Sequence, residues 1–201
     1  MLVPDKKRLL YLCWLTLFGM SAIGILIIHY WQQRSVESVL LGREPFSVEI
    51  GHKKYFLQVV AGLFFGSLSS LLAILLINGK FFSSVRKFFE HLIGDMNPTL
   101  PEIIFYSFCA AVGEEVLFRA GLQPVINIWP AAIVFVLLHG YITPYNMNLT
   151  FYGIFLVVIC AGFGYLFKFF GLFSSITAHF LYDVAMFSLL KYSYQKKTAG
   201  G

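Results

Sequence analysis

Apolar residues dominate the chain in long runs that short polar segments separate. Because a helix needs about 20 mostly apolar residues to cross the hydrocarbon core of a bilayer, this pattern predicts membrane-spanning helices. The runs indicate an all-α, polytopic membrane bundle of about six spans, of which the fourth is short. We expect these spans at residues 9–30, 55–77, 100–122, 130–142, 151–170 and 172–190.

A different pattern covers residues 81–93, where large apolar side chains recur at helical spacing and charged side chains fill the other face. The stretch is too short and too charged to span a bilayer, so it predicts one amphipathic helix in the headgroup layer. Three regions follow from these patterns. They are residues 1–99, with two N-terminal spans and the interfacial helix; residues 100–192, a four-span core; and residues 193–201, a polar tail.

Composition supports the membrane class. Of the 201 residues, 58% are hydrophobic and 12% are charged, whereas a soluble domain carries about 25% charged residues. The net charge of +5 comes mostly from basic residues between the apolar runs, where anionic lipid headgroups attract them. We therefore expect membrane lipids as partners and no nucleic acid. The three cysteines lie inside apolar runs and predict packing residues rather than disulfides.

Basic residues also predict an orientation. Nine lie on the side of the two termini and five on the other side, so the positive-inside rule favours cytoplasmic termini in a protein of the cell (inner) membrane. The nine are Lys6, Lys7, Arg8, Lys80, Arg86, Lys87, Lys191, Lys196 and Lys197, and the five are Arg34, Arg43, Lys53, Lys54 and Lys168. No small-residue cleavage site follows the first apolar run, which indicates an uncleaved span rather than a signal peptide.

Six ionisable residues stand out within the apolar runs of the core. A charged group near the bilayer centre costs at least about 2.5–3.5 kcal/mol on insertion scales, so such residues are candidates for a functional site. They are Glu114, Glu115 and Arg119 in the third span, His139 in the fourth, and His179 and Asp183 in the sixth.

Three of these residues are predicted to share one layer of the membrane. At 1.5 Å per helical residue, Glu114, His139 and His179 lie about 12, 14 and 11 Å below the face opposite the termini. Gly113, which has no side chain, stands just before the acidic pair. Its place in the sequence lets either a substrate backbone or another helix approach closely.

Spacing within the helices predicts two pairs. Glu115 and Arg119 are i,i+4 neighbours, so they can form an ion pair that lowers the cost of burying either charge. Glu114 points away from this pair and is left free. His179 and Asp183 are also i,i+4 neighbours, and an Asp beside a His fixes its tautomer and raises its basicity.

A free carboxylate and an imidazole in a partly dry cavity can hold and deprotonate a water. Alternatively, Glu114, His139 and His179 could bind zinc, which lowers the pKa of a bound water to about 7. Either arrangement allows amide hydrolysis without a Ser or Cys nucleophile. Serines such as Ser107 and Ser174 lie in no recognisable nucleophile motif.

Three motifs follow one another on separate spans: Glu114-Glu115-Val-Leu-Phe-Arg119, Phe135-Val-Leu-Leu-His139 and His179-Phe-Leu-Tyr-Asp183. In this order they resemble the Glu-Glu-x-x-x-Arg, Phe-x-x-x-His and His-x-x-x-Asn/Asp motifs of the CAAX-protease and bacteriocin-processing family, also called Abi. The resemblance covers about residues 100–190. It implies an intramembrane endopeptidase whose site faces the cytosol, with residues 100–192 as the catalytic core.

The resemblance also implies roles for the site residues. They are water activation for Glu114 and His139, site organisation for Glu115 and Arg119, and oxyanion stabilisation for His179 and Asp183. An ionised Asp cannot donate a hydrogen bond to an oxyanion. Asp183 is therefore protonated, orients His179, or helps to bind a metal.

We expect an enzyme that cleaves membrane-associated peptides or protein termini, such as prenylated CAAX-type or bacteriocin- and signal-peptide-type substrates. Two alternatives belong to other functional classes. One is a non-catalytic bacteriocin-immunity or scaffold protein, which has no need for Glu114 and His139 together. The other is a small proton-coupled transporter, which the absence of an internal sequence repeat disfavours.

Overall fold

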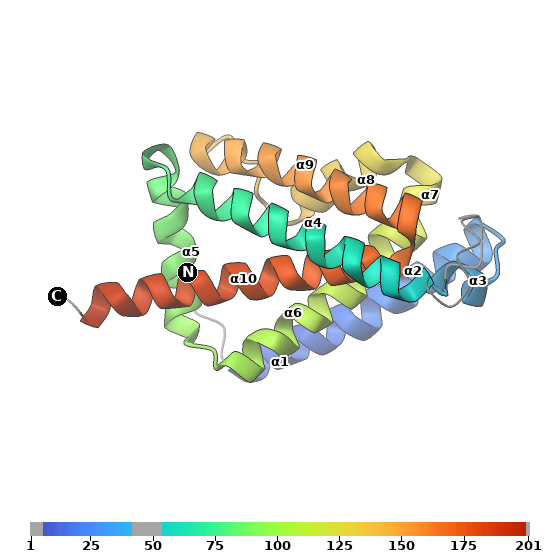
Figure 1. Cartoon of the computed structure of the whole chain (residues 1–201), viewed down its shortest axis with the longest axis horizontal. Coiled ribbons are helices and arrows are strands. Elements are labelled where there is room, and N and C mark those ends of the chain that lie inside the picture. The colour runs from blue at the N-terminus through green and yellow to red at the C-terminus, as the bar shows by residue number, and fades with distance from the viewer. Residues whose placement is uncertain (1–5, 42–53, 200–201) are drawn as a thin grey trace.

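The protein is a bundle of helices in a computed structural model that describes residues 6–41 and 54–199 (Figure 1). Within these ranges, four helices are long and apolar enough to cross a membrane by length and composition. This confirms the predicted all-α bundle of an integral membrane protein. The elements in chain order are α1 (Lys6–Trp14), η1 (Leu15–Met20), α2 (Ser21–Leu26), η2 (Ile27–Trp31), α3 (Val36–Leu40), α4 (Lys54–Ile77), η4 (Lys80–Phe82), α5 (Ser83–Met96), α6 (Leu100–Glu115), η5 (Val116–Leu122), α7 (Gln123–Ile126), α8 (Ile128–Leu138), α9 (Met147–Phe170) and α10 (Leu172–Ala199).

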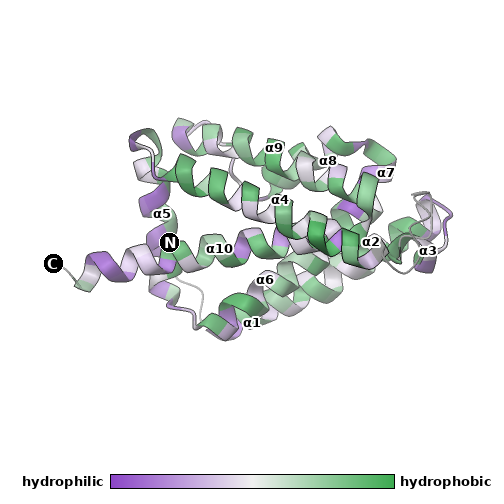
Figure 2. Ribbon diagram, in the orientation of Figure 1, coloured by the Kyte–Doolittle hydropathy of each residue, from purple (hydrophilic) through white to green (hydrophobic). Residues whose placement is uncertain are grey.

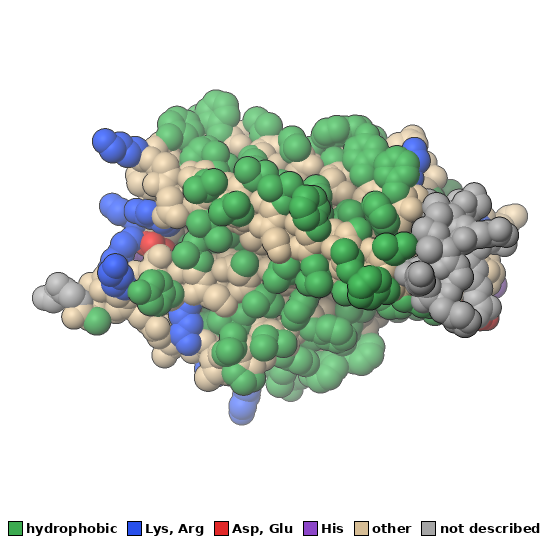
Figure 3. Space-filling view, viewed as in Figure 1, with side chains coloured by type: hydrophobic (Ala, Val, Ile, Leu, Met, Phe, Trp, Pro, Cys, Tyr) green, Lys and Arg blue, Asp and Glu red, His purple; other side chains and the backbone are tan. Residues whose placement is uncertain are grey.

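The outer surface of the bundle is apolar along its middle. Figure 2 shows hydrophobic residues along most of α4 and α9, and Figure 3 shows Lys and Arg side chains gathered at the end where α5 and the C-terminus lie. Large apolar side chains such as Phe64 and Leu75 are exposed on α4. Apolar surface of this extent suits contact with lipid acyl chains.

The third and fourth predicted spans differ in length from the helices that the structure has there. The third is one helical run from Leu100 to Ile126, which changes from α-helical to π-helical geometry at η5. The fourth was predicted too long, because α8 ends at Leu138 after 11 residues. A helix of that length rises about 16 Å and covers only part of a bilayer of about 30 Å. Gly140, with a φ of 73°, turns the chain just after His139.

α5 lies across one end of the bundle, roughly perpendicular to α4, α9 and α10 (Figure 1). Val85 and Ile93, on its apolar face, are buried, whereas Lys87 is exposed. This is the orientation expected of the predicted interfacial helix. Asn97, in the left-handed region with a φ of 41°, ends α5.

The predicted polar tail is mostly helical, because α10 continues to Ala199. Two contacts with α5 hold this extension. The Tyr194 hydroxyl donates to Asp95 Oδ1 at 2.9 Å, and Lys197 Nζ lies 2.5 Å from Glu90 Oε2. The polar sequence gave no sign of these contacts, and they explain why the helix does not end at the membrane surface.

Glycines let the helices around the site approach closely. A Cβ at Gly113 would collide with the carbonyl oxygen of Thr16 in η1. Of the two expectations for Gly113, the structure therefore has the close approach of another helix, the first span. A Cβ at Gly62 of α4 would lie 2.5 Å from the carbonyl oxygen of Ser174 in α10.

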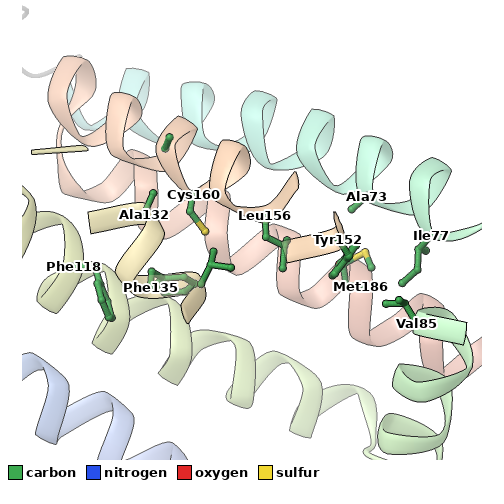
Figure 4. Packing of buried hydrophobic residues seen from close by; sticks show 12 residues of the cluster. Ala73, Ile77, Val85, Phe118, Ala132, Phe135, Tyr152, Leu156, Cys160 and Met186 are labelled. Atoms are coloured by element: carbon green, nitrogen blue, oxygen red, sulfur yellow. The ribbon is translucent and has the colours of Figure 1, made fainter. Parts of the chain in front are cut away.

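A hydrophobic cluster supports the site from the side of α8 and α9 (Figure 4). Phe118 comes from η5, Phe135 from α8, Leu156 and Cys160 from α9, and Met186 from α10. The cluster therefore connects the helices that carry the acidic residues and the histidines.

Candidate active site

The structure brings the six predicted site residues together. Glu114 and Glu115 end α6, and Arg119 follows in η5. His139 caps the C-terminal end of the short α8, while His179 and Asp183 lie one turn apart on α10. Glu114 lies within salt-bridge distance of both histidines, so the three residues predicted to share one depth lie close together.

Glu115 is the buried centre of the cluster, with none of its surface exposed. Its Oε2 lies 3.2 Å from Nε of Arg119, which confirms the predicted i,i+4 ion pair. Its Oε1 lies 3.0 Å from Nδ1 of His179. Because an ionised carboxylate only accepts hydrogen bonds, the Nδ1–H of His179 donates to Glu115.

This contact changes the expected role of Asp183. Orientation of His179 was one of the three roles open to Asp183, and the Asp183 Oδ2 lies 3.6 Å from Nε2, the other ring nitrogen. The hydrogen bond that fixes the ring comes from Glu115. The reason is that α6 and α10 pack side by side, which brings Glu115 next to Nδ1. Asp183, one turn along α10 from His179, lies nearer to Nε2 instead.

Glu114 faces both imidazoles. Its Oε2 lies 3.8 Å from Nε2 of His139 and 3.8 Å from Nε2 of His179. The Nδ1 of His139 lies 2.8 Å from the carbonyl oxygen of Phe135, which can only accept, so His139 donates through Nδ1. A neutral His139 therefore presents the lone pair of Nε2 towards Glu114. The two atoms are too far apart for a direct hydrogen bond, and one water can contact both.

Aromatic rings hold the two histidines in place. His139 stacks on Phe135 at a centroid distance of 4.3 Å and lies parallel to Tyr141 at 5.9 Å. His179 stacks on Phe163 of α9 at 5.5 Å. Sequence reasoning missed Tyr141 and Phe163. Phe135 is visible one turn before His139, whereas Phe163 lies on another helix with no local signal.

A cavity of about 200 Å³ opens next to these groups and is lined by Glu114, His139, His179 and Asp183 among others. A second cavity, of about 150 Å³, adjoins it and reaches Phe89 on α5. The residues that line both are Tyr141, Leu156, Tyr182, Asp183 and Phe187. The free space beside the site therefore leads towards the basic end of the bundle, although helix positions alone had placed the site nearer the opposite face.

The charges of the site do not balance while both imidazoles are neutral. Three carboxylates and one guanidinium then give a net charge of −2 in a largely buried cluster. Burial of uncompensated charge is costly, so the site favours binding protons. Protons on an imidazole or on Asp183 bring the cluster towards neutrality.

The zinc alternative stays a prediction. Among the residues that the structure describes, no group of three or more His, Cys, Asp or Glu side chains is placed to hold a metal ion. The Nδ1 atoms of both histidines are engaged in hydrogen bonds, as is usual for metal-binding histidines, and both Nε2 atoms lie 3.8 Å from Oε2 of Glu114.

The other nucleophile types near the site are engaged in hydrogen bonds or packing. The Ser174 hydroxyl donates to the carbonyl oxygen of Gly171, and Ser175 to that of Leu172. Cys13, Cys109 and Cys160 are free and buried, as predicted for packing residues. Cys160 lines the cavity, where it packs among apolar side chains.

Comparison with known proteins identifies the core. Residues 96–185 match the family model "Type II CAAX prenyl endopeptidase Rce1-like". The chain is also 30% identical over 103 residues to the uncharacterized protein YpbD of Bacillus subtilis (strain 168), a match that covers 49% of this chain and 51% of that protein. The match thus spans about half the length of this curated relative, and no solved structure matches the chain. The resemblance that the three motifs predicted is confirmed at this level: residues 96–185 are similar to the Rce1-like family of CAAX prenyl endopeptidases.

Proposed function

We propose that this protein is an intramembrane endopeptidase that hydrolyses peptide bonds with a water held by Glu114 and His139. The observation that carries the proposal is the 3.8 Å separation of Glu114 Oε2 and His139 Nε2 at a cavity inside the bundle. Both atoms accept hydrogen bonds, so a water between them directs one hydrogen to each. Its lone pair is then free to attack a carbonyl carbon.

The reaction proceeds in two steps. The water oxygen bonds to the peptide carbonyl carbon while one of its protons moves to Glu114, which gives a tetrahedral oxyanion. The carbon–nitrogen bond then breaks, and the leaving amine takes the proton from Glu114. His139 orients the water throughout, because its Nδ1–H is held by the Phe135 carbonyl and its ring is flanked by Phe135 and Tyr141.

His179 is the candidate donor to the oxyanion. Glu115 holds its Nδ1, and its Nε2 faces the same space as Glu114. When His179 carries a second proton, Nε2–H can donate to the developing negative charge. Asp183, at 3.6 Å from Nε2, stabilises that imidazolium, which gives it a role that needs no hydrogen bond from Asp183 itself. Arg119 keeps Glu115 ionised and in place.

The surroundings favour membrane-associated substrates. The adjoining cavities are lined largely by apolar and aromatic residues and lead to the end of the bundle where the basic residues gather. The positive-inside rule assigns this end to the cytoplasm of a cell membrane. Peptides or protein termini that insert from that surface, prenylated CAAX-type and bacteriocin- or signal-peptide-type chains among them, are the substrate class.

Peptide cleavage by the purified protein in liposomes tests the proposal. The probes are fluorogenic peptides with and without a farnesylated Cys near the C-terminus. Glu114→Gln and His139→Ala should each lower kcat by at least about 100-fold, the usual contribution of a general acid or base. His29→Ala removes a histidine of η2, outside the site, and is the matched control. This variant should cleave like wild type.

Two results would contradict the proposal. One is cleavage by both site variants at the wild-type rate. The other is an absence of cleavage by the folded wild type while cellular function survives both substitutions, which would favour a scaffold role. A chelator added in a parallel series should leave the rate unchanged, because no step of the proposed reaction uses a metal.

A further inference from the structure

A third cavity lies at the end of the bundle away from α5. It has a volume of about 360 Å³ and is lined by Arg34, Gln123, Trp129, Tyr165 and Lys168 among others. Arg34 follows η2, Gln123 begins α7, and Trp129 lies in the first turn of α8. Tyr165 and Lys168 lie in the last turns of α9. None of them touches the site described above, so the catalytic proposal leaves this cavity unexplained.

The cavity is positively charged. Arg34 and Lys168 are its charged residues, and no carboxylate belongs to the described residues that line it. Neither cation forms a salt bridge within the described part of the chain. Lys168 Nζ lies 5.7 Å from the centroid of the Phe169 ring, a contact that leaves its hydrogen-bond donors available. Two such cations attract a phosphate group.

The aromatic residues place the cavity at headgroup depth. Trp129 and Tyr165 are 47% and 40% exposed, next to the ends of α8 and α9. Trp and Tyr concentrate at this level of a membrane, because their rings are apolar and their N–H and O–H groups reach polar partners.

Gln123 adds a hydrogen-bond acceptor. Its side chain is 94% buried, and its Nε2 donates to the carbonyl oxygen of Gly164 at 2.9 Å. Its Oε1 is buried with no hydrogen-bond partner among the described residues. An unpaired buried acceptor costs about 1–3 kcal/mol, so it indicates a donor that the protein does not supply. A hydroxyl of a lipid headgroup is such a donor.

We propose that this cavity binds the headgroup of an anionic glycerophospholipid. Arg34 and Lys168 take the phosphate, Gln123 accepts from a headgroup hydroxyl, and Trp129 and Tyr165 line the path of the acyl chains. Gln123 is one helical turn beyond Arg119 in the same helical run. A lipid bound here therefore stabilises the end of the helix that carries the acidic residues.

Lipid retention tests the site without any measurement of cleavage. The purified protein is mixed with equal amounts of phosphatidylglycerol and phosphatidylcholine, and native mass spectrometry measures the lipid that remains bound. Wild type should prefer phosphatidylglycerol. Arg34→Ala with Lys168→Ala should lower that preference about 10- to 30-fold, since each cation near a lipid surface contributes roughly a factor of five. Lys87→Ala with Lys196→Ala, a matched loss of two charges at the other end, should keep it.

Several results would overturn the proposal. An Arg34→Ala/Lys168→Ala variant with the wild-type preference would show that the phosphate lies elsewhere. Equal stabilisation against heat by glycerol 3-phosphate and by phosphatidylglycerol would show a soluble phosphate ligand. Should the alanine variant not fold, Arg34→Lys with Lys168→Arg serves in its place. This charge-preserving variant must retain the preference, and its loss would also contradict the site.

Discussion

The ion pair of Arg119 and Glu115 provides the sharpest test of the site's architecture. Neither side chain is exposed, and Nε of Arg119 lies 3.2 Å from Oε2 of Glu115. Arg119→Met removes the guanidinium while keeping a long apolar side chain. The Glu115 carboxylate is then buried without its arginine, and breaking a buried pair in this way costs about 3–5 kcal/mol.

Two further contacts adjust this estimate. Arg119 lies 5.7 Å from the centre of the Phe135 ring, and a desolvated cation–π contact adds up to about 2 kcal/mol to the loss. In the other direction, His179 remains at 3.0 Å from Glu115 and can take a proton to compensate the charge. We therefore expect a net loss near the lower end, about 3 kcal/mol of the free energy of unfolding.

A double variant separates the charge effect from packing. In Arg119→Met with Glu115→Gln, neither of the two positions carries a buried charge, and the amide oxygen still accepts from Nδ1 of His179. Most of the lost stability should return. The control is Arg86→Met, which breaks an Arg–Glu pair of the same i,i+4 spacing at the bundle end, where Nε of Arg86 and Oε1 of Glu90 are 3.7 Å apart. Its cost should be smaller than that of Arg119→Met, because Lys197 still pairs with Glu90 and the Arg86 side chain is partly exposed.

Unfolding by SDS in mixed micelles, followed by tryptophan fluorescence, measures these differences. The reasoning is refuted if Arg119→Met costs less than about 1 kcal/mol, the range of an exposed pair. It is also refuted if the double variant is no more stable than Arg119→Met alone.

Two further predictions concern the contact between the first span and the catalytic helix. Gly113→Ala should destabilise the fold by about 1–3 kcal/mol in the same SDS assay, because the new methyl group collides with the Thr16 carbonyl. The cost of this collision exceeds the gain from the higher helix propensity of Ala. Gln32→Ala removes hydrogen bonds from Nε2 to the carbonyl oxygens of Ala120 and Gly121, at 2.8 and 2.6 Å. It should cost about 1–3 kcal/mol and slow peptide cleavage, and an unchanged unfolding midpoint would contradict it.

Features within one helix were predictable from the sequence. The Glu115–Arg119 pair needs only the i,i+4 spacing, and the common depth of Glu114, His139 and His179 needs only the rise per residue and the approximate ends of the apolar runs. The helix bounds followed the apolar runs closely where lipid contact sets them, as at α4 and α9.

Features that depend on contacts between helices were not predictable. The end of α8 at Leu138 lies inside an apolar run that continues to Ile142, so composition alone could not show the turn at Gly140. The extension of α10 depends on contacts such as Tyr194 with Asp95. Local propensity and hydropathy carry no information about such partners, which are distant in the sequence.

The two adjacent glutamates show most clearly what the fold adds. Sequence spacing gave Glu115 one partner, and the packing of α6 against α10 gave it a second, so Arg119 holds Oε2 and His179 holds Oε1. With both oxygens engaged, Glu115 cannot accept a proton from water without losing a buried hydrogen bond. The Oε2 of Glu114 lies beyond hydrogen-bond distance of both Nε2 atoms, at 3.8 Å, and Glu114 lines the cavity. The contacts between helices thus distinguish two chemically identical neighbours, and they support our proposal that Glu115 orders the site while Glu114 takes the proton from water.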